Sequence, residues 1–179
     1  MGKEKKETAP LTLAGNIDRD TFVRFALFDS FRLKKRWKNP AIFAAIFLFF
    51  ALVCFLGRET HEQAMLMTLV LLAVGLVLPA VWFLMYMYSV NQQVKKNGLS
   101  AGHAQYFVVL NAPGVRVMNE EEKAEFSWKQ ICAAYRVRGC IYLYISDAKA
   151  FLMPKCEDSE QAWAILTEQL GEGKCRDLR

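Results

Sequence analysis

The sequence predicts a membrane α-helical hairpin, formed by two transmembrane helices, together with a small α+β domain. Three observations lead to this fold class. Two long apolar runs, 41–57 and 64–90, carry much of the 54% hydrophobic content of the 179 residues. After residue 98, apolar positions alternate with polar ones, which is the period of β-strands. Near the C-terminal end, residues 159–170 have apolar side chains at helical spacing.

The segment before the first apolar run is polar and basic. Residues 1–19 are rich in lysine, so we expect a disordered tail there. Residues 20–38 predict an interfacial amphipathic helix, with its apolar side in the acyl boundary and its bases on lipid phosphates. The alternative is that this helix packs on the C-terminal domain. The apolar stripe and the bases opposite it are Phe22, Ala26, Leu33 and Trp37 against Arg24, Arg32, Lys35 and Arg36.

The two apolar runs predict transmembrane helices over 40–57 and 64–90. The first is about 25 Å long at about 1.5 Å per residue, near the lower limit for a hydrocarbon core of about 30 Å. The second is about 40 Å long, so it must tilt, kink at Gly75 or Pro79, or continue beyond the bilayer. Because only residues 57–63 separate the runs, we expect an antiparallel hairpin in a multi-pass protein.

Basic residues flank the two runs on one side of the predicted hairpin. Residues 1–40 hold ten Lys or Arg against five Asp or Glu, so the excess charge lies beside a membrane run. Nucleic-acid binders carry such an excess on a folded domain, so we expect membrane lipids and no nucleic acid as partners. The loop between the runs offers only Arg58, which by the positive-inside rule places both termini in the cytoplasm. The candidate headgroup contacts are Lys34, Lys35, Arg36, Lys38, Lys95 and Lys96.

Residues 98–172 predict a cytosolic domain with an antiparallel meander of about six short strands and one buried face. The strands are expected over 105–110, 114–118, 124–128, 131–137, 141–145 and 150–153. Trp128 lies in register with apolar neighbours, so we expect it in the core. A closing helix over 159–170 has Asp158 and Gln161 at capping-box positions. A small curved sheet closed by a C-terminal helix is the pleckstrin-homology-like plan.

The run FSWKQICAAYRVRGCIYLYISDAKAFLMPK, residues 126–155, resembles the signature of the YcxB-like family of bacterial membrane proteins. The matching features are Trp128 followed by Ile131, an aromatic-rich strand over 141–145, and Phe151-Leu152 before Pro154-Lys155. Upstream, DRDTFVRFALFDSFRLKKRWKNP resembles the family's acidic-aromatic start before two transmembrane helices. The resemblance implies a bacterial source and a pleckstrin-homology-like domain without an established ligand. The chain departs from the family pattern at residues 156–158, which weakens an anion-binding role for Lys155.

The chain offers little material for catalysis or metal binding. Its five cysteines form no CxxC pair, and its two histidines, His61 and His103, are too few for a histidine-based zinc site. No nucleophile elbow, phosphate-binding loop or pair of carboxylates stands out. We therefore expect no metal, no cofactor and no enzymatic activity. Four bases form either a basic edge for an anionic headgroup or acidic peptide, or a solvated strand face: Arg136, Arg138, Lys149 and Lys155.

These features predict a membrane-anchored, non-enzymatic interaction module of the bacterial cytoplasmic membrane. Its domain would bind a protein partner or an anionic lipid headgroup at the inner leaflet. The alternative is a subunit of an oligomeric transporter or channel, formed by homo-oligomerisation. Because neither apolar run contains an ionisable side chain, a single copy lacks the groups that ion and proton pathways use at membrane depth. A membrane enzyme is a third reading, which the missing catalytic clusters argue against.

Overall fold

The computed structural model describes residues 10–56, 61–99, 104–118, 123–147, 149–154 and 158–179. The chain divides into two compact units. A helical unit comprises Ala26–Lys96, and an α+β unit comprises Met1–Phe25 together with Asn97–Arg179. The predicted fold class is confirmed, because two long apolar helices accompany a small domain with antiparallel strands and a final helix.

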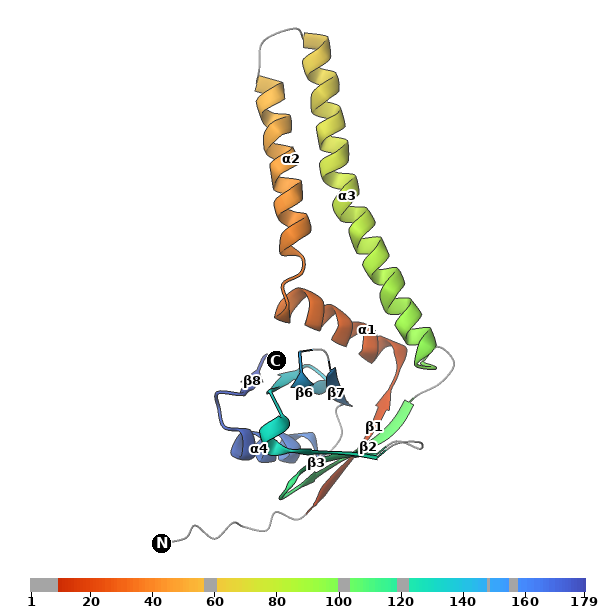
Figure 1. Ribbon diagram of the computed structural model, residues 1–179, viewed down its shortest axis with the longest axis vertical. Coiled ribbons are helices and arrows are strands. Elements are labelled where there is room, and N and C mark those ends of the chain that lie inside the picture. Colours follow the sequence, from red (N-terminus) through yellow and green to blue (C-terminus); the bar gives the residue numbers. More distant parts are fainter. Residues whose placement is uncertain (1–9, 57–60, 100–103, 119–122, 148, 155–157) are drawn as a thin grey trace. The chain divides into compact units, whose positions relative to one another are not determined.

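Two helices make up most of the helical unit: α2 (Lys38–Leu56) and α3 (His61–Lys96). They run antiparallel, as Figure 1 shows. Gly75 permits their close approach, because a Cβ atom at this position would lie 2.9 Å from Cβ of Phe47. α3 is one helix through Pro79 and continues six residues past the predicted end at residue 90. The second apolar helix is therefore longer than predicted.

The segment before α2 differs from the single helix predicted over 20–38. α1 (Arg19–Leu27) is α-helical, and the π-helical turn η1 (Phe28–Leu33) follows it directly. A π-helical turn holds more residues than an α-helical one, so it changes which side chains share a face. The chain then leaves the helix at Lys35, whose φ of 50° lies in the left-handed region. The predicted helix is therefore too long at its C-terminal end.

The first sheet holds four antiparallel strands in the order β1 (Leu11–Ile17), β2 (Ala104–Asn111), β3 (Gly114–Met118) and β4 (Lys123–Ser127). The prediction that residues 1–19 are disordered is wrong over Leu11–Ile17. This strand pairs with β2 along its whole length, and its alternate residues Leu13, Gly15 and Ile17 are buried. Residues 1–9 lie outside the described part of the chain.

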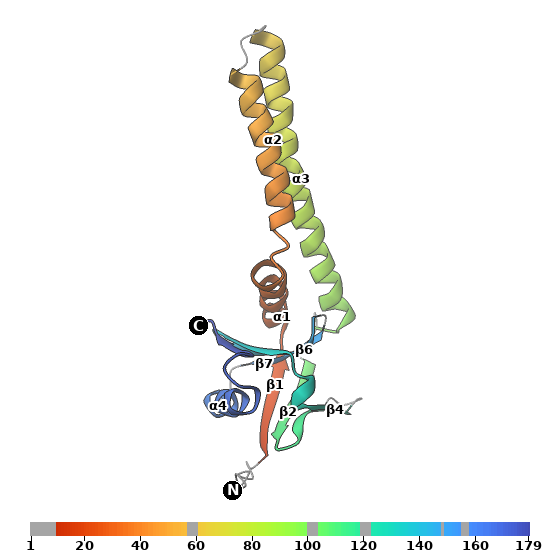
Figure 2. The same ribbon diagram turned by 60° about the vertical axis from the view of Figure 1, so that its left-hand side comes forward.

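The second sheet has the order β7 (Lys149–Pro154), β6 (Cys140–Ser146), β5 (Ala133–Val137) and β8 (Cys175–Asp177). β8 pairs parallel to β5, whereas the other neighbours are antiparallel. The predicted meander of six strands therefore lacked two strands, β1 and β8, and the eight described strands form two sheets instead of one. Strands of the two sheets cross steeply (Figure 2). The domain also extends past the predicted boundaries of 98–172 at both ends.

The final helix, α4 (Ser159–Leu170), has the predicted bounds. Its predicted capping box is wrong, because Asp158 makes no side-chain cap hydrogen bond. A capping box occurs instead at Ser127 and Gln130, which enclose the short 3-10 helix η2 (Trp128–Gln130). The backbone N–H of Ser127 donates to the Gln130 side chain at 2.8 Å.

The strand β6 is buried on both faces, so the expectation of one buried face is wrong for this strand. On one face, Leu143 joins Ile131 and Leu166 of α4 among the fully buried side chains. On the other face, the ring of Phe25 in α1 lies 5.1 Å from that of Tyr142 and 6.2 Å from that of Tyr144. α1 therefore packs on the domain through Phe25, which confirms the alternative interpretation for this part of residues 20–38.

Candidate functional site

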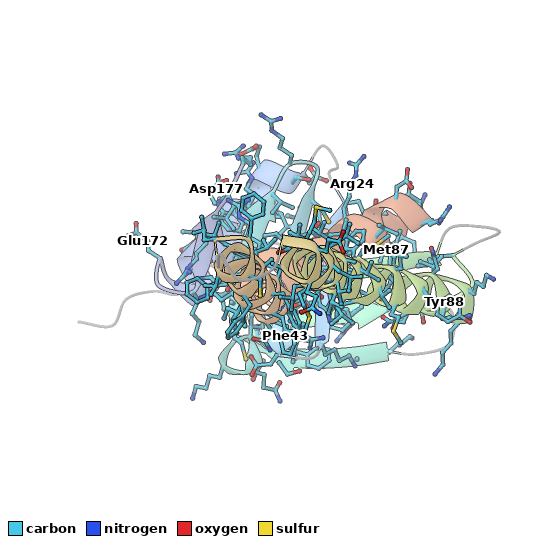
Figure 3. All side chains as sticks on the ribbon, turned by 90° about the horizontal axis from the view of Figure 1, so that it is seen from above. Arg24, Phe43, Met87, Tyr88, Glu172 and Asp177 are labelled. Atoms are coloured by element: carbon cyan, nitrogen blue, oxygen red, sulfur yellow. The ribbon has the colours of Figure 1, made fainter. Side chains whose placement is uncertain are left out.

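The surface of the α2–α3 hairpin is apolar and uncovered. Only 6% of the most apolar stretch of each helix is buried within the protein, and both helices are long and apolar enough to cross a membrane. Figure 3 shows side chains projecting outward around the helices, with Phe43 and Tyr88 among them. These two residues are 56% and 66% exposed. Apart from Phe107, every exposed large hydrophobic side chain in the described residues lies between Trp37 and Tyr88.

A cluster of aromatic rings joins η1 to α3, and we call it the aromatic collar: Phe31, Trp82, Phe83 and Tyr86. The ring of Phe31 lies 5.7–6.1 Å from the other three, in edge-on geometry. Trp82 and Tyr86 also stack on each other at 6.0 Å. The Tyr86 hydroxyl donates to the carbonyl of Ala26 at 2.6 Å, so the cluster has a polar anchor as well as ring contacts.

The six predicted headgroup contacts have different surroundings. Lys34 donates to Asp29 at 2.7 Å, so its charge already has a partner. Lys35 and Arg36 in the turn between η1 and α2, and Lys38 at the start of α2, are exposed. Basic side chains after the C-terminal end of a helix are also stabilised by the partial negative charge at that end. Lys95 and Lys96 are exposed at the end of α3.

The register of the two long helices separates these bases into two groups. Gly75 lies against Phe47, and the Thr68 hydroxyl is 3.5 Å from the carbonyl of Ala51. In an antiparallel pair, each step toward the start of α2 corresponds to one step toward the end of α3. Counted in this way from either contact, the residue of α3 opposite Lys38 is near residue 83. The structure therefore does not bring the six bases together, since Lys95 lies about 18 Å further along α3 at about 1.5 Å per residue.

The predicted basic edge of the domain is wrong for Arg136, which is a buried residue of the C-terminal packing. Its guanidinium pairs with Glu160 of α4 and lies 3.9 Å from Asp177 of β8. It also lies 5.7 Å from the ring centre of Trp163. A hydrogen bond from Arg179 lowers the pKa of the Asp177 carboxyl. These ion pairs join α4 and β8 to β5 instead of offering a free cation.

Of the other three bases of that edge, the two in the described part of the chain, Arg138 and Lys149, have separate surroundings. Lys149 lies over two rings, 5.8 Å from the centre of Phe126 and 5.7 Å from that of Phe151. Arg138 lies in the turn between β5 and β6. Lys155 is outside the described residues. The basic edge is thus reduced to separate cations.

Trp128 is half-buried, so its prediction as a core residue is wrong. Its indole N–H donates to the carbonyls of Asn111 and Ala112, each at 3.1 Å, and so holds the turn between β2 and β3. Near this turn, Gly114 is in very close contact with β4, because a Cβ atom would lie 2.0 Å from the carbonyl oxygen of Phe126. A shallow groove of about 200 Å³ runs along these strands, lined by Asn111, Pro113, Gly114, Arg116, Glu125 and Phe126.

Three buried groups near β6 are held neutral. Burial raises the pKa of the Cys140 thiol to about 12 and that of the Tyr142 hydroxyl to about 12. It also raises the pKa of Tyr106. The aromatic packing of Tyr142 under Phe25 was not predicted from the sequence, although the row of aromatic residues in β6 was the available signal. Across the described residues, no three His, Cys, Asp or Glu side chains gather at metal-binding distance.

The fold thus defines a class of protein with an apolar helical hairpin and a small α+β domain. Residues 110–170 match the model of the family described as YcxB-like protein, so the C-terminal part of the chain is a YcxB-like domain. The match runs from the end of β2 to the end of α4. No curated protein and no solved structure matches the chain significantly.

Proposed function

We propose that the chain is a membrane-anchored, non-enzymatic interaction module. The α2–α3 hairpin spans a bacterial cytoplasmic membrane twice, with both termini in the cytoplasm. The YcxB-like domain, with a pleckstrin-homology-like plan, holds a protein partner or an anionic lipid headgroup at the inner leaflet.

The single observation that carries this proposal is the uncovered apolar surface of the hairpin. Removing one large apolar side chain from water is worth about 1.5–3 kcal/mol. Exposed side chains such as Phe49, Phe55 and Leu76 recur along both helices. No acidic or basic residue lies between Lys38 and Arg58 or between Glu62 and Lys95. Such a surface is stable in hydrocarbon and prone to aggregate in water.

The charge distribution supports the proposed orientation. Lys35 and Arg36 precede α2, Lys38 begins it, and Lys95 and Lys96 end α3. Cytoplasmic flanks of transmembrane helices carry an excess of such bases. The domain follows α3 directly in the chain, so the same rule puts it in the cytoplasm.

The form of the domain supports a binding role. Arg116 and Glu125, which form an ion pair at 2.6 Å, line the groove together with the half-buried Phe126. Phe107 on β2 adds an aromatic side chain that is 44% exposed. Exposed aromatic side chains beside polar groups are the usual anchors of protein interfaces.

Proximity labelling tests the proposal. A biotin ligase fused to the full chain should label a defined set of neighbours at the membrane. Gly114→Ala should lose that set, because it displaces β4 while leaving the hairpin intact. Gly173→Ala should keep it, since a Cβ atom there meets nothing within 4 Å. An identical set for wild type and Gly114→Ala would show that the domain holds no partner, and would favour the transporter-subunit alternative.

A further inference from the structure

The helical unit contains an unexplained mismatch of length. α2 has 19 residues and is about 28 Å long, which matches a hydrocarbon core of about 30 Å. α3 has 36 residues and is about 54 Å long, so it exceeds that thickness by more than 20 Å. A tilt within the usual range removes only part of this excess.

We propose that the cytoplasmic boundary of the bilayer crosses α3 at the aromatic collar, so that the last third of the helix lies outside the bilayer, in the aqueous phase. Contact with anionic phospholipid is then confined to the turn between η1 and α2, through Lys35, Arg36 and Lys38. Lys95 and Lys96 do not touch the headgroups. This inference rests on the proposed membrane anchoring and makes it more specific.

The collar has the composition and the position of a membrane interface. Trp and Tyr side chains gather where hydrocarbon meets headgroups, because each combines an apolar ring with a polar group. Trp82 and Tyr86 lie at the level along α3 where α2 begins. Trp37, 47% exposed, directly precedes α2. Two chain segments therefore place aromatic residues at one level.

The composition of α3 changes beyond the collar. From Ala64 to Tyr88 it is apolar except for Thr68, whereas Asn91, Gln92 and Gln93 follow within two turns. The side chains of Gln92 and Gln93 are exposed, whereas the apolar Val90 and Val94 on either side of them are buried within the protein. Amide side chains are costly to place in hydrocarbon and need no cover in water. The polar end of α3 is thus suited to water.

Distance and screening separate the two groups of bases. Lys95 lies about 18 Å beyond the level of Lys38, and about 14 Å if α3 tilts by about 40° from the membrane normal. The Debye length is about 8 Å at physiological ionic strength. Attraction to the headgroups is therefore roughly six- to tenfold weaker for Lys95 and Lys96 than for bases in the turn. Lys34 adds little, since Asp29 already neutralises it.

Lysine labelling of the full wild-type chain tests this division. The chain is placed in nanodiscs of phosphatidylcholine alone, or of phosphatidylcholine with phosphatidylglycerol, and treated with a water-soluble acetylating ester. Mass spectrometry then reports the modification rate at each lysine. We expect phosphatidylglycerol to slow the labelling of Lys35 and Lys38 by about threefold or more, because an anionic surface keeps lysines protonated. Lys95 and Lys96 should change by less than about a third of that effect.

Three results would overturn the inference. If phosphatidylglycerol slows the labelling of Lys95 and Lys96 as much as that of Lys35 and Lys38, the boundary lies further along α3. If none of the four responds in chains that are embedded in the discs, the turn does not contact the headgroups. If the chain does not co-purify with the discs at all, the proposed anchoring fails too, which separates that failure from the other two.

Discussion

Gly114→Ala should destabilise the domain more than any other alanine substitution at a described glycine of the domain. The added methyl group would lie 2.0 Å from the carbonyl oxygen of Phe126 and 2.9 Å from Cα of Ser127. Both atoms belong to the backbone of β4, so no side-chain rotation relieves the clash. Overpacking costs about 1–3 kcal/mol, and each backbone hydrogen bond lost from the β3–β4 ladder costs about 1 kcal/mol more. The total is roughly 2–5 kcal/mol, a large part of the stability of a small domain.

Thermal unfolding of the full chain in nanodiscs, followed by near-ultraviolet circular dichroism, measures this effect. For a domain of about 60–100 residues, 2–5 kcal/mol lowers Tm by roughly 8–40 °C. Gly173→Ala is the matched control, because its methyl group meets no atom within 4 Å and its φ is ordinary. Equal melting temperatures for the two variants would refute the close approach of β3 and β4.

Three further predictions concern the packing of the domain. Glu160→Gln removes the negative charge that pairs with the buried Arg136, so it should lower the free energy of unfolding in urea by about 1–3 kcal/mol. Adding Arg136→Met to this variant should recover part of the loss, and no recovery would contradict the ion-pair account. Trp128→Phe keeps an aromatic side chain but replaces the indole by a smaller ring without an N–H donor, so it should cost at least about 1 kcal/mol in the same assay, and an unchanged midpoint would dismiss the role of that donor. At pH 8, iodoacetamide should modify the exposed Cys132 but spare the buried Cys140, as read by mass spectrometry. Because burial raises the folded pKa of Cys140 to about 12, the unfolded chain loses this proton first as pH rises, so stability should fall between about pH 9 and pH 12.

The sequence predicted the features whose signal is local. The helices α2 and α3 contain long apolar runs without charged residues, and such runs are typical of helices that can cross a membrane. The helix α4 has its predicted bounds because its apolar spacing stops at Leu170 and Gly171 follows, with φ of 78°. β3 has its predicted bounds as well, since Pro113-Gly114 marks the turn before it.

The features that were missed depend on contacts between distant parts of the chain. β1 is a short segment beside a lysine-rich tail, and its pairing partner is about 90 residues away. Its alternation was a weak local signal, because only the pairing with β2 makes so short a segment a strand. β8 has three residues and gains its order from β5 and from the ion pairs around Arg136. The burial of that arginine likewise follows from the docking of α4, which a strand pattern does not contain.

The candidate site was predicted only in part. The six bases were predicted to contact headgroups from their position beside the apolar runs, and this contact stays a prediction. The distance from Lys95 and Lys96 to the other four bases depends on the register of α2 against α3 and on the length of α3. The sequence does not specify either. The partner of Lys34 depends on η1, whose π-helical geometry was not predicted.

The topology of the hairpin tests the central claim most directly. Alkaline phosphatase, active only outside the cytoplasm, and a fluorescent protein, fluorescent only inside it, are fused in turn after residue 60 and after Arg179 in a bacterial host. The account predicts phosphatase activity for the fusion after residue 60 and fluorescence for the fusion after Arg179. Phosphatase activity at Arg179, or fluorescence from the fusion after residue 60, would contradict a hairpin that crosses the membrane twice with both termini in the cytoplasm.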